Sequence, residues 1–158
     1  MCITVFYILH WVEGKDSKDA AGIAYFFDNH MLCCLTSEGR WGIPKGHIHI
    51  DETPEEGAYR EFTEETQIIL NKPIEFSHKA KKKSGGDFHV FMCDGNKRFI
   101  PRLNHEHMDW GYFPIRNLPT PFDKRVIKVI DNISEASVTS NIQGMKGATG
   151  FIKPTDWE

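Results

Sequence analysis

The chain has 158 residues, of which 40% are hydrophobic and 26% charged, and its formal net charge is −3. This length suits one domain with a buried core, and the composition is that of a globular protein, which excludes a disordered chain. A weakly acidic chain has no overall basic field, so nucleic acid is not expected as an obligatory partner. The 4 cysteines form no Cys-x-x-Cys pair. We therefore expect reduced thiols in a cytoplasmic protein rather than a disulfide or zinc framework.

The amino-terminal segment is the first predicted strand. Residues 1–12 are largely apolar, and Cys2–His10 is rich in β-branched and aromatic side chains. The segment lacks the basic region and the cleavage site of a signal peptide, and it is shorter than the roughly 20 residues that cross a bilayer. We therefore expect a strand here and no membrane partner. The polar segment Glu13–Asp19 that follows is predicted to be a loop.

A β-hairpin is predicted next. The apolar segments Ala20–Phe27 and Met31–Leu35 flank Asp28-Asn29-His30, a sequence typical of a tight turn between two strands. The segment Arg40–Gly46 contains two glycines and a proline, and it is predicted to be a loop.

The segment Thr53–Gln67 carries the strongest helix signal in the chain. Thr53 is a typical N-cap residue, Pro54 suits the first helical position, and Glu56 completes a capping box three residues after the cap. Phe62 falls on an apolar side of this helix, which is expected to pack against a sheet.

The rest of the chain is predicted to add strands, a hairpin turn and a second helix. The predicted strands are Pro73–Lys79, Asp87–Cys93 and Trp110–Pro114, with the turn Ala80–Gly86 between the first two. The segment Phe122–Ser137 has apolar residues at helical spacing. Many strands with only two helices favour an α+β domain over a repeated βαβ fold. We assign residues 1–140 to this single domain and Asn141–Glu158 to a tail of unknown order.

Three glutamates share one face of the predicted helix. A helix turns by about 100° per residue, so Glu61, Glu64 and Glu65 fall within a face roughly 100° wide. Like charges at this spacing repel one another, and a solvated acidic surface is the simplest structural interpretation. A hard divalent cation such as Mg2+ would remove the repulsion, because carboxylate and phosphate oxygens are its preferred ligands. The helix alone leaves both interpretations open.

The wider spacing favours the metal site. Gly46 is followed by Glu52 after five residues, and seven more lead to Arg60-Glu61-Phe62-Thr63-Glu64-Glu65. This pattern resembles the Nudix box, Gly-x5-Glu-x7-Arg-Glu-U-x-Glu-Glu-x-Gly-U, where U is a bulky aliphatic residue in most members. Gln67 replaces the last glycine, which usually supports a left-handed turn after the helix. Either Gln67 adopts that turn at a cost of about 1–2 kcal/mol, or the helix runs one residue longer.

The resemblance implies an α+β fold in which helices sandwich a mixed β-sheet, and a pyrophosphohydrolase that uses Mg2+ or Mn2+. It implies these metal ligands: the carbonyl of Gly46 and the carboxylates of Glu61, Glu64 and Glu65. Glu64 is alternatively the group that deprotonates water. Glu52 and Arg60 are expected to pair and hold the loop against the helix, with a phosphate contact by Arg60 as the alternative.

Residues outside the box complete the expected site. In some members of the family, a loop glutamate shortly before an aromatic strand reaches the metal or the water. Glu106 stands at that position here, with a surface charge as the alternative role. Lys45 and Arg40 precede the box and are candidates to bind phosphate. Tyr112 is a candidate to stack on a base, and core packing is its competing role.

Two further groups of residues have open roles. Lys81, Lys82 and Lys83 would add charge for a long polyphosphate or an RNA 5′ end, or they would only keep an edge of the sheet soluble. Two His-x-His pairs, His47 with His49 and His105 with His107, resemble zinc ligands. They lack cysteine partners at suitable spacing, so structural zinc is not expected.

The segment Pro44-Lys45-Gly46-His47 looks like the form found in Nudix hydrolases of dinucleoside polyphosphates and of inositol pyrophosphates. The preferred hypothesis is therefore a small-molecule substrate such as diadenosine tetraphosphate. The alternatives with the same chemistry are ADP-ribose or NAD-type molecules, inositol pyrophosphates and an RNA 5′ end. A non-catalytic nucleotide-binding regulator is the hypothesis from another class, and the intact set of box glutamates argues against it.

Overall fold

The computed structural model describes residues 15–133 of the chain. The predicted strand Cys2–His10, the tail Asn141–Glu158 and the domain boundary at residue 140 lie outside this range. The described elements, in order, are β1 (Asp16–Phe27), β2 (His30–Thr36), β3 (Trp41–Gly42), β4 (Lys45–His49), α2 (Pro54–Thr66), β5 (Glu75–Lys81), β6 (Asp87–Asp94) and β7 (His107–Pro114). A helical segment, residues 128–133, ends the described range.

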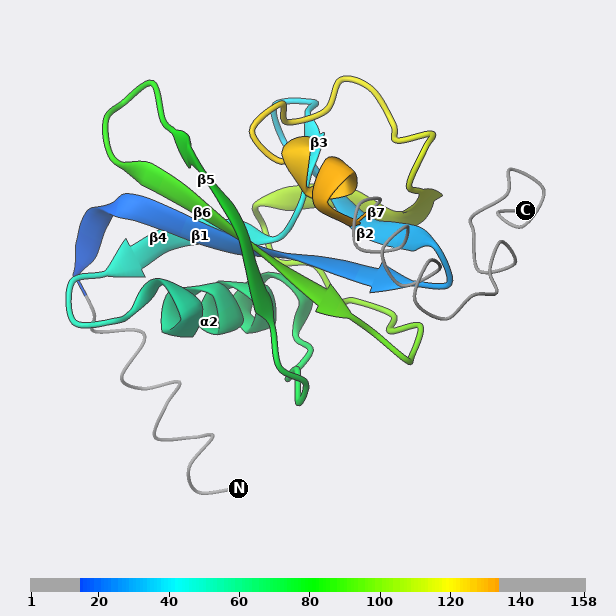
Figure 1. Ribbon diagram of the computed structural model, residues 1–158, viewed down its shortest axis with the longest axis horizontal. Helices are drawn as coiled ribbons and strands as arrows, with labels where there is room; N and C mark the ends of the chain where they lie inside the picture. The colour runs from blue at the N-terminus through cyan, green and yellow to red at the C-terminus, as the bar shows by residue number, and fades with distance from the viewer. Residues whose placement is uncertain (1–14, 134–158) are drawn as a thin grey trace.

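The long strand β1 organises a mixed sheet, which has 7 strands among the described residues (Figure 1). On one side β1 pairs in parallel with β6, and β6 pairs antiparallel with the outer strand β5. On the other side, the first part of β1 pairs with β4 and its end pairs with β2, both antiparallel. The strand β2 also pairs with β3 and β7. This arrangement places β4, which contains Gly46 of the box, beside the long strand β1.

A helical element covers each face of the sheet, as the predicted sandwich requires. On one face, α2 buries Ala58 and Phe62 in a core that it shares with β1 and β6. On the other face, Val126 and Val129 are buried in a second core. Figure 1 shows α2 on one side of the sheet and the segment 128–133 on the other. The α+β fold with a sandwiched mixed sheet is therefore confirmed.

Two of the predicted loops contain strand residues. The prediction of a loop over Glu13–Asp19 is wrong from Asp16 onward, because β1 begins there and pairs Asp16 with His49 of β4. The loop predicted over Arg40–Gly46 is wrong in part, because it contains β3 and the start of β4. The start of β1 and β4 pair with each other although they are distant in the sequence, and β3 is bridged to Phe122 as well as paired with β2, contacts that local composition does not reveal.

The helix α2 matches its predicted capping. Thr53 accepts the backbone N–H of Glu56 with its hydroxyl oxygen, and the Glu56 carboxylate accepts the N–H of Thr53 in return. After the helix, Gln67 adopts a left-handed conformation with φ of 65° and donates its N–H to the Thr63 carbonyl. Of the two alternatives at Gln67, the structure therefore has the left-handed turn and not the longer helix.

Both predicted hairpins are present. Asp28 and Asn29 have positive φ values of 53° and 61° in the tight turn between β1 and β2. The strand β5 starts and ends two residues later than the predicted Pro73–Lys79, so the turn before β6 is confined to residues 82–86. The strand β7 starts at His107 rather than at Trp110, because its pairing with β2 continues to Thr36.

The carboxyl-terminal part of the described range departs from prediction at its start. Phe122 forms a strand bridge with Trp41 instead of opening a helix, and helical residues begin at 128. Among residues 15–133, no helix is long and apolar enough to cross a membrane. The 3 cysteines in this range, Cys33, Cys34 and Cys93, are free and buried.

Candidate active site

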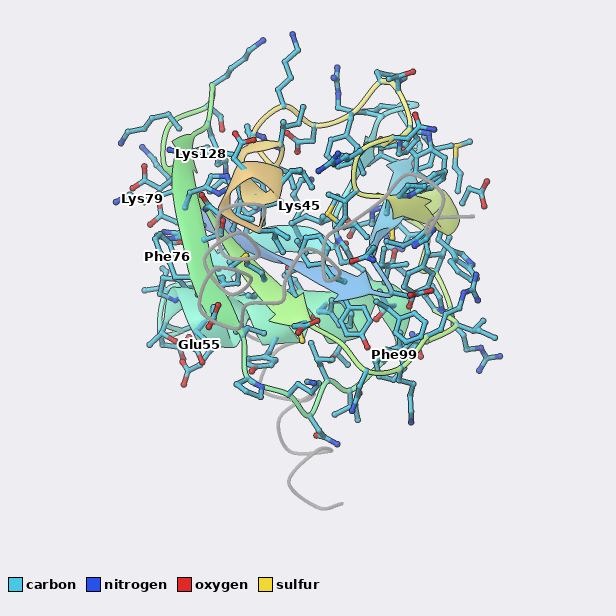
Figure 2. All side chains as sticks on the ribbon, turned by 45° about the vertical axis from the view of Figure 1, so that its right-hand side comes forward. Lys45, Glu55, Phe76, Lys79, Phe99 and Lys128 are labelled. Carbon is cyan, nitrogen blue, oxygen red and sulfur yellow. The ribbon has the colours of Figure 1, made fainter. Side chains whose placement is uncertain are left out.

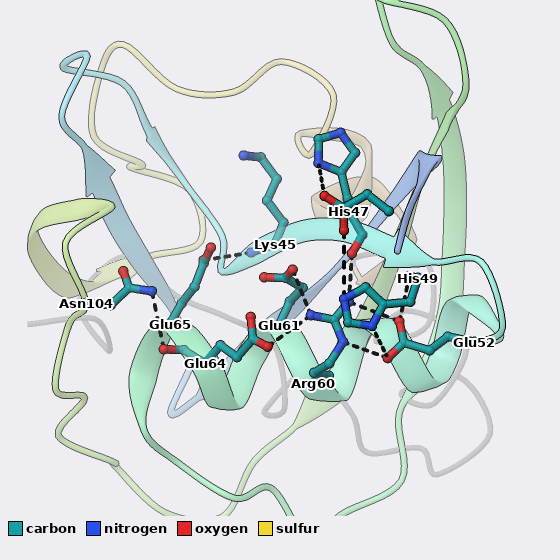
Figure 3. Close-up of polar contacts among 10 residues, drawn as sticks. Lys45, His47, His49, Glu52, Arg60, Glu61, Glu64, Glu65 and Asn104 are labelled. Carbon is teal, nitrogen blue, oxygen red and sulfur yellow. Dashed lines mark hydrogen bonds and ion pairs between the residues drawn. The ribbon is translucent and has the colours of Figure 1, made fainter. Parts of the chain in front are cut away.

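The helix α2 presents its three glutamates to the start of β4 (Figure 3). The side chain of Glu65 is 2% exposed, that of Glu61 is 12% exposed and that of Glu64 is 38% exposed. Glu65 Oε1 accepts the backbone N–H of Lys45 at 3.0 Å. Glu65 is therefore buried against β4 and Glu61 is largely buried there, whereas Glu64 remains open to solvent.

Glu61 lies directly against Gly46. A Cβ atom at Gly46 would come within 2.2 Å of the Glu61 carboxylate, which is much closer than two such atoms can approach. Gly46 is also paired with Ala21 of β1, so its backbone cannot shift without disturbing the sheet. The absence of a side chain at this position therefore lets the buried glutamate reach the strand.

The side chains of Glu61, Glu64 and Glu65 form the acidic face of α2. Arg60 joins this face to the loop that precedes α2. Its side chain is buried and donates to the two oxygens of Glu52 at 2.6 and 3.0 Å, and to the carbonyl of His47 at 2.7 Å. Its other terminal nitrogen donates to Glu61 and Glu64 at 3.1 Å each. These contacts use all five N–H groups of the guanidinium. The expected pairing of Glu52 with Arg60 is present, and no donor of Arg60 is left for a phosphate.

Burial and mutual repulsion raise the pKa values of the two buried glutamates. Burial, and then the charge of Glu64, raises the pKa of Glu61 to about 7, although Arg60 acts in the opposite direction. Burial, and then the charge of Glu61, raises the pKa of Glu65 to about 9. For Glu52, burial acts to raise the pKa, but hydrogen bonds from Arg60 and from the backbone of His49 lower it overall. Arg60 and Lys45 therefore offset only part of the burial and repulsion at Glu61 and Glu65, whereas the charge of Glu52 is compensated.

The acidic face has the donor chemistry of a hard cation site. Within residues 15–133, no three His, Cys, Asp or Glu side chains close tightly around one point. Mg2+ does not need such a cage, because it keeps several waters and takes further oxygens from phosphate. A divalent charge beside Glu61, Glu65 and the Gly46 carbonyl would favour the ionised carboxylates whose pKa values are raised. The residues present therefore fit such an ion.

The loop before β7 brings Glu106 to the same region. Asn104 donates from its side-chain amide to the carbonyl of Glu64 at 3.4 Å, and its amide oxygen accepts the N–H of Glu106 at 3.0 Å. The charge of Glu106 contributes to the raised pKa values of Glu61 and Glu65. The loop glutamate therefore lies within electrostatic range of the acidic face.

The candidate substrate residues differ in their positions. The charge of Lys45 acts on the pKa of Glu65, so this lysine adjoins the acidic face. Arg40 is exposed in the turn between β2 and β3, and among the described residues no hydrogen bond or ion pair joins its side chain to the acidic face. Tyr112 donates its hydroxyl to the carbonyl of Phe99 at 3.0 Å and packs against the core on the α2 side. These contacts favour the packing role of Tyr112 over base stacking.

Two contributors to this site were not predicted as such from the sequence. The carbonyl of His47 accepts from Arg60, and a backbone acceptor leaves no signature in the sequence. The second is His107, whose side chain is buried and whose Nε2 lies 3.7 Å from Glu65 Oε1. The His-x-His pattern marks His107 as a possible ligand but does not tell which carboxylate it approaches.

Comparisons with known proteins agree with this geometry. A family model described as the NUDIX domain matches residues 16–133. Dihydroneopterin triphosphate diphosphatase of Haemophilus influenzae is 27% identical over 128 residues. The match covers 68% of this chain and 78% of that protein.

Similar solved structures share the fold. A MutT NUDIX hydrolase from Burkholderia pseudomallei is 21% identical with a TM-score of 0.65, covering 73% of this chain and 96% of that one. The NUDIX domain of Shewanella oneidensis NrtR, complexed with ADP ribose, is 18% identical with a TM-score of 0.62, covering 84% and 97%. A C. elegans Ap4A hydrolase is 20% identical with a TM-score of 0.54, covering 79% and 94%.

The fold and the acidic helix define a hydrolase that acts on acid anhydrides in phosphorus-containing compounds. The chain belongs to the NUDIX family, since the family model covers nearly all of the described residues. Members of this family generally use divalent metal ions.

Proposed function

We propose that this enzyme hydrolyses a phosphoanhydride bond of a nucleotide-like oligophosphate, with Mg2+ or Mn2+ bound at the acidic face of α2. The observation that carries the proposal is the burial of Glu61 and Glu65 beside Gly46, where a side chain would block the approach. Buried like charges are costly, and a divalent cation is the natural partner that relieves the cost. A purely structural helix face would gain nothing from this arrangement.

The residues of the acidic face divide the work. Glu61, Glu65 and the carbonyl of Gly46 would hold the cation, which when bound neutralises phosphate charge and acidifies a water molecule. Glu64 is the most exposed of the three glutamates, so it can serve as a further ligand or take the proton from water. Glu106 approaches from the loop before β7 and can orient the same water.

Glu52 and Arg60 act as supports in this proposal. Both side chains are buried, and together they link β4, through the carbonyl of His47, to the glutamates of α2. Their contribution is to hold the carboxylates in place before the substrate arrives. A direct role of Arg60 with phosphate would require it to give up one of these bonds.

For the substrate, we infer an oligophosphate of several phosphates, with a dinucleoside polyphosphate as first candidate. Burial, and then the charges of Arg125 and Lys45, lower the pKa of Lys82. Three cations from separate elements are therefore within electrostatic range of one another. In Figure 2, Lys45 lies nearer the middle of the sheet, and Lys79 marks the outer strand β5, which leads into the hairpin that carries Lys82. A phosphate chain that extends from the acidic face would place negative charge beside these cations.

Dihydroneopterin triphosphate is the second candidate, because the curated relative with 27% identity is named for its action on this compound. Both candidates carry an organic ring system and a chain of consecutive phosphates. ADP-ribose, inositol pyrophosphates and an RNA 5′ end contain the same kind of bond and remain comparison substrates. Binding of a nucleotide without turnover would be the behaviour of a regulator.

A hydrolysis screen tests the proposal. Purified protein would be incubated with diadenosine tetraphosphate, dihydroneopterin triphosphate, ADP-ribose, an inositol pyrophosphate and 5′-triphosphorylated RNA, each with Mg2+, with Mn2+ and with EDTA. We expect metal-dependent release of phosphate-containing products, with the highest kcat/KM for one of the first two compounds. Undiminished turnover in EDTA, or binding without hydrolysis of every compound, would contradict the proposed function.

A further inference from the structure

His107 occupies an unusual position beside the acidic face. It is the first residue of β7, and its side chain is only 5% exposed. Its Nε2 atom lies 3.7 Å from Glu65 Oε1, so the imidazole edge faces the more deeply buried of the glutamates. The other ring nitrogen, Nδ1, is buried and has no hydrogen-bond partner among the residues that the structure describes.

An unpartnered ring nitrogen makes histidine a poor choice for packing alone. A buried polar atom without a hydrogen bond costs about 1–3 kcal/mol of folding stability. A phenylalanine would fill a similar volume without that cost. A buried ring nitrogen without a partner is therefore more typical of a residue that serves a site than of one that only fills a core.

The two oxygens of Glu65 have different surroundings. Oε1 accepts the N–H of Lys45 at 3.0 Å and faces the His107 ring. Within the described part of the chain, Oε2 makes no hydrogen bond, so it is free to meet a cation. Burial, and then the charge of Lys45, lower the pKa of His107. The role described next rests on the position of the ring nitrogen Nε2 beside Oε1 and needs no change in the ionisation of the ring.

We propose that His107 is a positioning residue for Glu65: with the Lys45 amide it fixes the orientation of the carboxylate through Oε1 and leaves Oε2 for the divalent cation. The inference rests on the proposed metal-dependent function and adds a residue that does not itself bind the ion. The 3.7 Å separation is longer than a hydrogen bond. At this range the contact is electrostatic, and its strength depends on the low dielectric of the buried site. Replacement of a residue that orients a metal ligand without touching the metal commonly weakens metal binding by roughly 10- to 100-fold.

Mn2+ binding to the protein without substrate tests this role. The variants are His107→Phe and His107→Leu, which remove the ring nitrogens, and His107→Gln, which keeps an N–H donor. His105→Phe is the matched control, because His105 is an exposed histidine two residues away. Free Mn2+ would be measured by electron paramagnetic resonance at constant pH, and thermal unfolding of each metal-free variant would be recorded beside it.

We expect His107→Phe and His107→Leu to weaken Mn2+ binding by about tenfold or more. At least one of them should keep a metal-free Tm equal to or above that of the wild type. His107→Gln should recover most of the affinity, and His105→Phe should bind as the wild type does. In turnover assays the loss should appear in kcat and in the Mn2+ requirement, with little change in the substrate KM.

Three results would overturn the inference. The first is wild-type Mn2+ affinity in His107→Phe or His107→Leu. The second is a lower metal-free Tm in all three His107 variants with no recovery of affinity in His107→Gln, which would assign the ring to packing. The third is an equal loss in His105→Phe. If the wild-type protein itself bound no Mn2+, the proposed function would fail together with the inference, whereas wild-type binding with unaffected variants would refute the inference alone.

Discussion

At the scale of single residues, Gln67 shows how a departure from a pattern is resolved. The sequence leaves two alternatives open, a left-handed residue or a longer helix. The structure has the left-handed residue, with φ of 65°, and its N–H still closes the last turn of α2 on Thr63. The backbone after the helix therefore has the left-handed conformation that glycine usually adopts there. Because Gln67 has a side chain, this conformation is strained.

Replacement of Gln67 by glycine should stabilise the protein. The substitution would relieve about 1–2 kcal/mol of left-handed strain, and the greater freedom of glycine in the unfolded chain would return part of that gain. We expect a net increase of about 0.5–1 kcal/mol in the free energy of unfolding by urea. Gln67→Ala serves as the control and should give no increase. A destabilised Gln67→Gly variant would show that the Gln67 side chain contributes more than the turn costs.

A contact between two residues is predictable from the sequence when both contacting groups belong to side chains. The Glu52–Arg60 pair is expected from the box and is present at 2.6 Å. The contact of Arg60 with the carbonyl of His47 was not predictable, because every residue has a carbonyl. The approach of His107 to Glu65 also depends on how β7 is placed beside β2, which no local pattern encodes.

At the scale of elements, helix α2 was predictable and the short strands were not. Its capping box and apolar face are local features that lie within a few residues of one another. In contrast, β3 has two residues, which pair with β2 and bridge to Phe122, and β4 has five, which pair with the distant strand β1. Glycine and proline in this segment indicate a loop locally, whereas the sheet uses Gly22 and Gly46 for close approach.

The lysines of the β5–β6 hairpin are not equivalent in the structure. Lys81 forms an ion pair with Asp87 at 2.9 Å on an exposed edge. Lys82 donates to the carbonyl of Lys18 at 2.8 Å and lies within range of the charges of Lys45 and Arg125. Lys82 is therefore the member of the group that is best placed to meet a phosphate chain.

The triple variant of Lys81, Lys82 and Lys83 to alanine should raise the KM for a long polyphosphate or RNA substrate. Most of the effect should be reproduced by Lys82→Ala and little by Lys81→Ala, which is the matched control. Because the interaction is electrostatic, the KM difference from wild type should shrink at about 0.5 M salt relative to about 0.05 M. A KM at low salt that is unchanged in the triple variant would favour a role in solubility.

At the scale of the whole molecule, the acidic face links stability to pH. The pKa values of Glu61 and Glu65 are raised to about 7 and about 9, from 4.5. Between the ordinary pKa of 4.5 and these raised values, the folded, metal-free protein holds more protons on Glu61 and Glu65 than the unfolded chain does. Stability from these groups is therefore present at low pH and is lost as pH rises.

Thermal unfolding in EDTA should show this dependence. Between about pH 7 and about pH 8.5, the Tm of the metal-free wild type should fall further than that of Glu65→Gln, in which the buried acid is replaced by a neutral amide. The comparison cancels the titration of other groups. Mg2+ should reduce the difference, because the bound ion stabilises the ionised carboxylates. If the Tm of the metal-free wild type fell no further than that of Glu65→Gln over this interval, the raised pKa values would be contradicted.

The whole fold was predictable to the level of its family, and the substrate was not. The spacing from Gly46 to Glu65 identifies the box, and the box implies both the sandwiched sheet and the acidic site. In the proposed function, substrate choice would depend on side chains from separate elements, such as Lys45, Lys82 and Arg125, whose charges lie within range of one another only in the folded chain. The location of the protein in the cytoplasm and the assignment of Asn141–Glu158 to a tail stay predictions.

The most direct test of the central claim compares Glu65→Gln with Glu52→Gln. Glu65 should touch the cation, so loss of its charge should lower kcat by at least about 10²-fold and shrink the rise in Tm that Mg2+ produces in the wild type. Glu52 is bonded to Arg60 and to the backbone of His49, so Glu52→Gln should cost less in kcat and keep the Mg2+-induced rise in Tm. Near-normal turnover and a full Mg2+ response in Glu65→Gln would contradict the account, even though the chain belongs to the family.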